Sequence, residues 1–317
     1  MAGPSQEHPL VAARKMEVGY NYPWAWNQYG TYFGSSSDRW LEQIVWDMNS
    51  LGVLGIHHMR VFLLCNAWTL GHFQKIPTSH VPLGHNPPVD NYEYMPPTTE
   101  DPRFASQLKR LLEEARTQGM QLLLSFVCFG AFSPLPNPGA GGRSEIATNL
   151  NKGKLFLDNV LDPLLRTAKD FKNINDIIYA WEVINEPSWN TTIRSPPAGY
   201  AATVPADAMH RFITEVLTRF TNAGFERTTV GHRFYTDFGS LPTGSIRQFH
   251  YYPYTSPDWP RWAAVKAWAA PGDANTLPPF SQTQAIVGEF GVRHGTEFGG
   301  PWAELGGRDV GNEPGQT

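Results

Sequence analysis

The 317-residue sequence has few cysteines, almost no excess charge and no long apolar run. Its two cysteines, Cys65 and Cys128, cannot form a disulfide framework and lack the paired spacing of a metal site, so we expect buried thiols. A net charge of −4 gives no electrostatic reason to bind nucleic acid or an anionic membrane. No stretch approaches the roughly 18 apolar residues of a membrane span. These absences argue against disulfide-rich, nucleic-acid-binding and membrane-spanning proteins.

The amino terminus carries neither the basic nor the apolar segment of a signal peptide. We therefore expect a cytoplasmic protein or the mature form of a secreted one. Residues 1–15 are expected to form a flexible tail. Because no change of composition marks a linker, the sequence predicts a single domain over residues 1–317.

Short apolar, β-rich segments alternate along the chain with segments of helical periodicity. Strands are expected at residues 16–22, 56–64, 120–128, 177–187, 227–231, 246–252 and 285–290. Helices are expected around residues 41–51, 102–118, 155–168 and 209–220. This alternation in one long chain favours an α/β fold with parallel strands, a (β/α)8 TIM barrel rather than a doubly wound sheet.

Several helix ends are marked by capping residues. In the first expected helix, Ser37 can cap the start and Gly52 ends it. Asp101 is a natural N-cap for the second helix, and Gly119 suits its C-terminal end. Pro163 must kink or start the third helix, because proline cannot donate a hydrogen bond within a helix.

Polar residues cluster where several of the expected strands end. The strand ends read Asn185-Glu186-Pro, His250-Tyr-Tyr252-Pro and Gly-Glu289-Phe-Gly. In a barrel the carboxyl ends of all strands converge on one face, where catalytic groups gather. Two opposed carboxyl groups suit glycosidic cleavage, because one protonates the leaving oxygen and the other attacks the sugar or activates water. The alternative is that both glutamates are solvent-exposed loop carboxylates.

The order of these motifs resembles that of a known family. Trp181-Glu-Val-Ile-Asn-Glu-Pro, followed by the histidine–tyrosine motif and Gly-Glu289-Phe-Gly, resembles the clan A retaining glycoside hydrolases. The most similar pattern is that of glycoside hydrolase family 5, the cellulase and β-mannanase group. Arg60 matches the arginine that ends the second strand in that family. The resemblance runs from about Val18 to Phe290 and implies a TIM barrel.

The resemblance also implies the catalytic roles. Glu186 would be the general acid/base and Glu289 the nucleophile. Arg60 would lie near Glu289 and keep it ionised, because a neighbouring positive charge favours the carboxylate. Tyr252 would donate a hydrogen bond to Glu289. The reaction needs no cofactor and no metal, and the expected partner is a carbohydrate substrate.

Further residues are expected to bind that substrate. The resemblance implies that Asn185 hydrogen-bonds the 2-hydroxyl of the sugar at the cleavage site, and that His250 lines the site near the acid/base or the substrate. Trp24, Trp26 and Asn27 follow the first strand, where the indole rings could stack on sugar faces or simply pack in the core.

Three features stand apart from these motifs. Glu182 alternates onto the same strand face as the acid/base, and we expect it deeper in the barrel as a bonded polar residue or, alternatively, as a catalytic carboxylate. The long segment 71–97 is expected to be a loop that shapes substrate subsites. No eighth apolar strand follows Glu289, so we expect residues 292–317 to be irregular or truncated, with the eighth strand and helix missing or truncated.

The sequence thus predicts a retaining β-glycoside hydrolase that cleaves β-linked polysaccharide or oligosaccharide. The substrate is expected to be β-mannan or β-glucan. Mannan is favoured because Met59-Arg-Val-Phe and Gly19-Tyr-Asn-Tyr resemble the mannanase branch. A β-glycosidase for small aglycones and a non-catalytic carbohydrate-binding barrel are the alternatives.

Overall fold

Seven parallel strands form the central sheet of the computed structural model, which describes residues 19–22, 24–25, 28–29, 38–64, 72–75, 92–132, 143–193, 204–233, 237, 239–251 and 285–290. The strands are β1 (Tyr20–Tyr22), β4 (His58–Leu64), β7 (Gln121–Cys128), β8 (Ile178–Asn185), β9 (Thr228–His232), β10 (Arg247–Tyr251) and β11 (Ala285–Phe290). They lie side by side in chain order, as in a (β/α)8 barrel, so the predicted fold class is confirmed.

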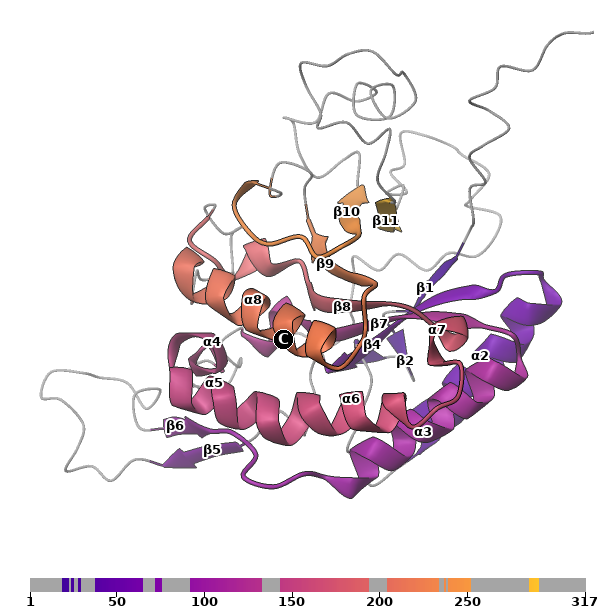
Figure 1. Ribbon diagram of the computed structural model, residues 1–317, viewed down its shortest axis with the longest axis horizontal. Coiled ribbons are helices and arrows are strands. Elements are labelled where there is room, and N and C mark those ends of the chain that lie inside the picture. The colour runs from indigo at the N-terminus through magenta and orange to yellow at the C-terminus, as the bar shows by residue number, and fades with distance from the viewer. Residues whose placement is uncertain are drawn as a thin grey trace, which may run out of the picture.

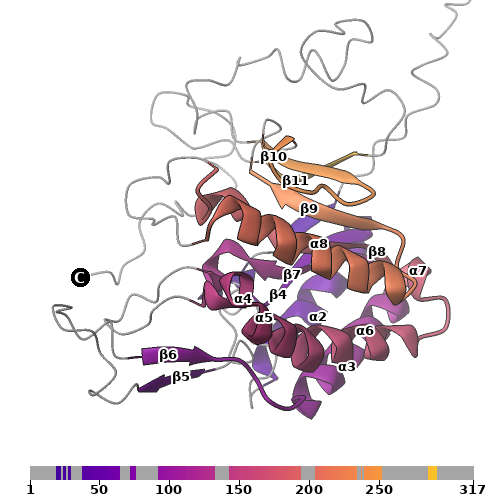
Figure 2. The same cartoon turned by 60° about the vertical axis from the view of Figure 1, so that its left-hand side comes forward.

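Helices pack along the outer face of this sheet. In Figure 1, α2, α3, α6 and α8 lie on one side of the strands, and Figure 2 shows α8 beside β8 and β9. The α-helices are α2 (Arg39–Val53), α3 (Pro102–Thr117), α4 (Glu145–Thr148), α5 (Leu150–Phe156), α6 (Asp162–Lys169), α7 (Ile174–Ile177) and α8 (Ala206–Asn222). Two 3-10 turns, η4 (Phe129–Ala131) and η6 (Pro187–Trp189), follow β7 and β8.

The two faces of each strand carry different residues. On β4, Met59 and Val61 belong to the main apolar core shared with the helices, whereas the alternating residues Arg60 and Phe62 do not. The inner face of the sheet has a small apolar cluster of its own, made by Leu123, Ala180 and Ile246. Polar side chains occupy the inner face beyond this cluster, and they form the site described below.

The ends of α3 confirm the prediction, and those of α2 correct it. The Asp101 carboxylate accepts a hydrogen bond from the Arg103 N–H at 2.9 Å, and Gly119 takes φ +62° just after α3. Helix α2, however, starts after Asp38 instead of using Ser37 as its cap, and it continues through Gly52 to Val53. The Asp38 carboxylate accepts from Gln107 on α3 at 2.8 Å. Gly55 adopts φ +75° after α2, so the turn needs glycine there and not at 52.

Pro163 lies within a continuous helical segment, where the hydrogen-bond pattern of the helix changes. Helix α5 passes into a π-helical turn, η5 (Leu157–Leu161), and α6 continues from Asp162 with Pro163 as its second residue. A proline cannot donate the intrahelical hydrogen bond, and a π turn beside it is a common way for a helix to accommodate that loss.

The segment 71–97 was predicted to be a long loop, and the structure shows that it contains two short strands. Strands β5 (His72–Lys75) and β6 (Tyr92–Met95) pair in antiparallel register, and the Tyr94 N–H donates to Oε2 of Glu145 on α4 at 3.3 Å. In both views this pair lies apart from the seven-stranded sheet (Figures 1 and 2). Each strand is only four residues long, which is too short for its alternation to stand out.

Some predictions fall on residues that the structure does not describe. They concern the tail 1–15, the segment 292–317 and Cys65. Cys128 is described, and it is a buried free thiol as predicted. In the described part of the chain, no helix is both long and apolar enough to cross a membrane.

Candidate active site

A buried ion pair links two strands across the inner face of the sheet. Arg60 on β4 donates from Nε to Glu182 Oε2 at 2.7 Å and from Nη2 to Glu182 Oε1 at 2.6 Å. The two side chains are only 4% and 0% exposed. Strand β7 lies between β4 and β8, so the pair spans three adjacent strands. Two strand spacings come to about 10 Å, which the long arginine and glutamate side chains together can bridge on one face of the sheet.

The ion pair belongs to a larger hydrogen-bond network. Arg60 Nη1 donates to Asn21 Oδ1 on β1 at 3.1 Å, and Arg60 Nη2 also donates to Asn185 Oδ1 at 2.7 Å. From β10, Gln248 Nε2 donates to Glu182 Oε2 at 3.0 Å. The Glu182 carboxylate therefore receives three hydrogen bonds, which offset the cost of burying its charge. Glu182 is the bonded polar residue inside the barrel that its strand position predicted.

A glycine on β9 makes room for this network. A Cβ atom at Gly231 would lie 2.3 Å from Glu182 Oε1, closer than any real contact allows. The carbonyl oxygen of Gly231 also accepts the N–H of Glu186 at 2.7 Å. Gly231 thus lets β9 approach the Glu182 carboxylate closely. Its carbonyl oxygen also holds the backbone of Glu186 in place.

Glu186 directly follows β8 and has an unusual backbone conformation. Its φ is +51° and its ψ +55°, the left-handed region that non-glycine residues rarely adopt. Holding such a residue costs on the order of 1–3 kcal/mol, and residues of this kind concentrate at functional sites. The bend ends the strand and begins the turn η6. Glu186 is only 7% exposed, so it is not a solvated loop carboxylate.

Both carboxyl oxygens of Glu186 have hydrogen-bond partners. Nδ1 of the fully buried His250 on β10 lies 2.9 Å from Oε1. Nε1 of Trp189, in turn η6, donates to Oε2 at 2.7 Å. An indole N–H can only donate, whereas a histidine nitrogen donates or accepts according to its tautomer. The contact with His250 can therefore form with either the protonated or the ionised Glu186. The hydrogen bond from Trp189 is strongest when Glu186 is ionised.

A second buried histidine lies close to His250. His232 ends β9 and is fully buried. The pKa of His232 is lowered to about 3, mainly by burial. A hydrogen bond with the backbone of Pro242 opposes this shift, and the nearby His250 adds to it. His232 is therefore neutral at neutral pH and places no positive charge beside His250.

The structure brings four of the predicted site residues together. Arg60, Asn185, Glu186 and His250 form the connected polar cluster just described. Asn185 Oδ1 faces the guanidinium group, so its amide nitrogen is the atom that can donate elsewhere. Arg60 was expected beside Glu289, whose side chain lies outside what the structure describes; in the described part of the chain Arg60 bonds to Asn21, Glu182 and Asn185.

Glu289 lies on β11, where the structure describes its backbone. It pairs in register with His250, and an irregularity in the pairing falls between Phe249 and His250. The intervening residue, Gly288, is crowded, since a Cβ there would lie 2.3 Å from Gln248 Nε2. An extra residue opposite one partner is the pattern of a β-bulge, which glycine tolerates well.

For the other predicted substrate-binding residues, the structure does not describe the side chains. Trp24 belongs to β2 (Trp24–Ala25), which pairs with β3 (Gln28–Tyr29), and its backbone alone is described. Trp26, Asn27 and Tyr252 lie outside the described residues.

Sequence reasoning missed three residues of this cluster. Trp189 follows the Asn-Glu-Pro motif by two positions, and the short turn that folds it back onto Glu186 has no sequence signature. Gln248 alternates inward with His250 on β10, and that alternation could have identified it. His232 follows the inward-facing Gly231, so alternation alone would have placed it on the other face. In the part of the chain that is described, no cluster of three or more His, Cys, Asp or Glu side chains could hold a metal ion.

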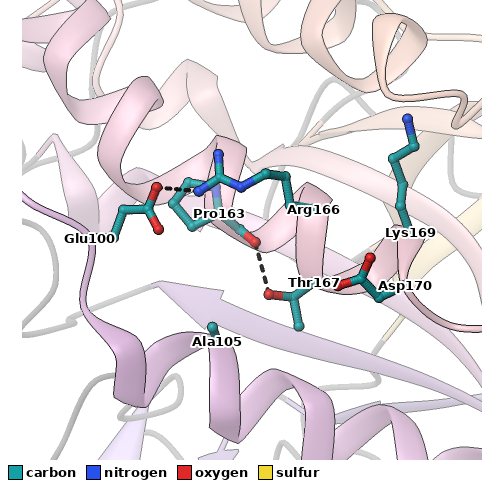
Figure 3. A pocket seen from close by; sticks show the side chains of 7 residues that line it. All are labelled: Glu100, Ala105, Pro163, Arg166, Thr167, Lys169 and Asp170. Atoms are coloured by element: carbon teal, nitrogen blue, oxygen red, sulfur yellow. Dashed lines mark hydrogen bonds and ion pairs between the residues drawn. The ribbon is translucent and has the colours of Figure 1, made fainter.

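A groove on the helical outer surface is separate from this cluster. Figure 3 shows the Glu100–Arg166 ion pair across it. Both of these side chains are more than half exposed. The lining residues are Glu100, Ala105, Pro163, Arg166, Thr167, Lys169 and Asp170, none of which belongs to the cluster. Exposed ion pairs of this kind are common on protein surfaces and do not by themselves indicate a functional site.

Several solved structures have a fold similar to that of this chain. The chain is similar to β-1,4-D-mannanase from Cryptopygus antarcticus, with a TM-score of 0.53 and 18% identity over 75% of this chain and 68% of that one. It is similar to β-1,4-mannanase from the sea hare Aplysia kurodai (TM-score 0.51, 13% identity, 76% and 72% covered). It is also similar to β-mannanase from the blue mussel Mytilus edulis (TM-score 0.50, 15% identity, 75% and 71% covered).

No family model matches the sequence, and neither does any curated protein. At such low identity the likeness establishes the fold alone. The chain resembles the family 5 glycoside hydrolases in its barrel fold as well as in its motifs.

Proposed function

We propose that this protein is a retaining β-glycoside hydrolase with Glu186 as general acid/base and Glu289 as nucleophile. The observation that carries the proposal is the placement of Glu186. Its carboxyl group is buried at the carboxyl end of β8 and is held by His250, which pairs in register with Glu289 on β11. Double displacement requires two carboxyl groups that face each other across the scissile bond, and separate barrel strands whose ends meet on one face can supply them.

The reaction would proceed in two balanced steps. In the first, a carboxylate oxygen of Glu289 bonds to the anomeric carbon while the glycosidic C–O bond breaks, and Glu186 gives its proton to the departing oxygen. In the second, Glu186 takes a proton from water, the water oxygen bonds to the anomeric carbon, and the ester to Glu289 breaks. Both groups then return to their starting protonation states.

We propose β-1,4-linked mannan as the substrate, with β-glucan as the alternative. The motifs Met59-Arg-Val-Phe and Gly19-Tyr-Asn-Tyr support mannan. The barrel fold shared with three β-mannanases agrees with that choice. Asn185 would bind the 2-hydroxyl of the sugar through its amide nitrogen, since Arg60 holds the amide oxygen.

A polysaccharide panel tests this proposal. Linear β-mannan, glucomannan and a soluble β-glucan are incubated with wild type, with Glu289→Gln, and with Glu42→Gln as a matched control on the exposed side of α2. We expect new reducing ends from mannan with wild type and the control, and none with Glu289→Gln. Equal activity of Glu289→Gln would refute the nucleophile assignment. Binding of a polysaccharide without turnover by wild type would favour the non-catalytic barrel.

A further inference from the structure

The turn that follows Glu186 places an indole against its carboxyl group. Trp189 Nε1 donates to Glu186 Oε2 at 2.7 Å, and the Trp189 backbone N–H bonds to the Glu186 carbonyl oxygen at 3.2 Å. The turn itself is anchored to the neighbouring strand end, because the buried Asn190 amide donates to the carbonyl oxygen of Phe129. The turn that carries the indole is therefore also held by a contact that does not involve the Glu186 side chain.

Two further contacts hold the indole ring. The guanidinium carbon of Arg233 lies 3.8 Å from the centroid of the Trp189 ring, a cation–π contact. The Phe129 ring lies with its centroid 5.7 Å away and its plane tilted by 31°. A ring held in this way has little rotational freedom, so its N–H points at Glu186 without further ordering.

We infer that Trp189 is a positioning residue that holds the Glu186 carboxyl group for the second half of the reaction. This inference rests on the proposed function of Glu186. A retaining glycosidase needs its acid/base first as a neutral acid and then as a carboxylate. The indole can only donate, so it stabilises the carboxylate more than the acid. Trp189 thus holds Oε2 as an acceptor, and the proton that Glu186 gives and recovers is carried by Oε1, beside His250.

Trp189→Phe is the variant that isolates the N–H, because a phenyl ring keeps the packing surface for Phe129 and Arg233. Trp46→Phe, on the exposed face of α2, is the matched control. With an activated aryl glycoside, for which the second step limits turnover, we expect kcat of Trp189→Phe to fall about tenfold while kcat/KM changes less. The basic limb of its kcat/KM profile should move about one unit toward higher pH, because the ionised acid/base loses a donor.

The elements around this carboxyl group carry other charged or titratable residues, which also shape the profile. They are His250 on β10, His232 and Arg233 at the end of β9, Arg60 on β4, Glu182 on β8 and, by register, Glu289 on β11. All of them are identical in wild type and Trp189→Phe, so the difference between the two profiles reports the indole. A fall in kcat and kcat/KM by the same factor, with no shift of the basic limb, would contradict the inference.

A second readout needs no turnover. In wild type we expect the Trp189 indole proton, assigned by its loss in Trp189→Phe, to titrate with pH in NMR spectra, and we expect Glu186→Gln to abolish that titration. An indole signal that does not titrate, or that titrates equally in Glu186→Gln, would overturn the inference. A wild type that hydrolyses no glycoside would refute the proposed function instead, and the indole titration would still decide the role of Trp189.

Discussion

Nδ1 of His250 lies 2.9 Å from Oε1 of Glu186, although the two residues are 64 positions apart in the chain. The contact joins the end of β8 to β10 across β9. It therefore links the Glu186 carboxyl group to His250, which pairs in register with Glu289 on β11. This relationship connects the two carboxylates that the proposed reaction needs.

Glu186→Ala should separate the acid role from the base role. On polysaccharide, whose leaving group needs protonation, we expect activity to fall by about 10²–10⁴-fold. On an aryl glycoside with a good leaving group the first step should survive, and azide should restore turnover by attacking without a base, giving a β-glycosyl azide. Glu289→Gly with azide should give the opposite anomer. NMR of the products identifies the anomers, and the same anomer from both variants would show that the roles are wrongly assigned.

Arg60→Met should destabilise the fold strongly. It leaves the buried Glu182 carboxylate without its partner, which costs about 3–5 kcal/mol of unfolding free energy. Arg211→Met breaks an exposed pair with Asp207 on α8 and should leave the urea midpoint unchanged. The double variant Arg60→Met/Glu182→Leu should recover much of the lost stability while remaining inactive, since Asn185 has lost the donor that orients it. Full activity in the double variant would show that the network does not position Asn185.

The predictions from sequence succeeded where local chemistry decides. Asp101 and Gly119 marked the ends of α3 because capping depends on adjacent residues. Glu186 and His250 were recognised because motifs at strand ends gather on one face of a barrel. Gly52 was wrongly taken as a helix end, since only the tertiary path shows that the turn with positive φ falls at Gly55.

Contacts made across the barrel could not be predicted in the same way. The pairing of Arg60 with Glu182 depends on the order of the strands in the sheet, which no local pattern encodes. The hydrogen bond from Trp189 depends on the left-handed backbone at Glu186, a conformation that propensities disfavour for glutamate. Both features belong to the site, where local rules are most often overridden.

Gly231→Ala should impair both stability and turnover. The new Cβ would lie 2.3 Å from Glu182 Oε1 and must displace that carboxylate, at a cost of about 1–3 kcal/mol. Gly52→Ala is the matched control, because nothing lies within 4 Å of a Cβ there and alanine favours the helix by about 0.5–1 kcal/mol. Thermal unfolding should show opposite shifts for the two variants. A Gly231→Ala protein as stable and active as wild type would contradict the close packing of β9 against Glu182.

His232 should make the fold sensitive to acid. Its pKa is about 3 in the folded state and 6.5 for an unperturbed histidine, so between these values the unfolded chain binds a proton that the folded protein does not. Stability therefore falls as pH drops from about 6.5 toward 3, by at most about 1.4 kcal/mol per pH unit from this group. In denaturation series over this range, His232→Gln should show a flatter dependence than wild type, whereas His210→Gln, at an exposed position on α8, should not. Parallel curves for wild type and His232→Gln would contradict a buried neutral histidine.

The central claim is tested most directly by trapping the glycosyl-enzyme. The protein is incubated with activated 2-deoxy-2-fluoro β-glycosides of mannobiose and cellobiose, whose fluorine slows the second step so that the ester accumulates. Mass spectrometry of the intact protein and of its peptides then locates the adduct. We expect one sugar unit per chain, attached to Glu289, with faster labelling by the mannobioside. An unlabelled protein, or an adduct on Glu182, Glu186 or any other residue, would contradict the account.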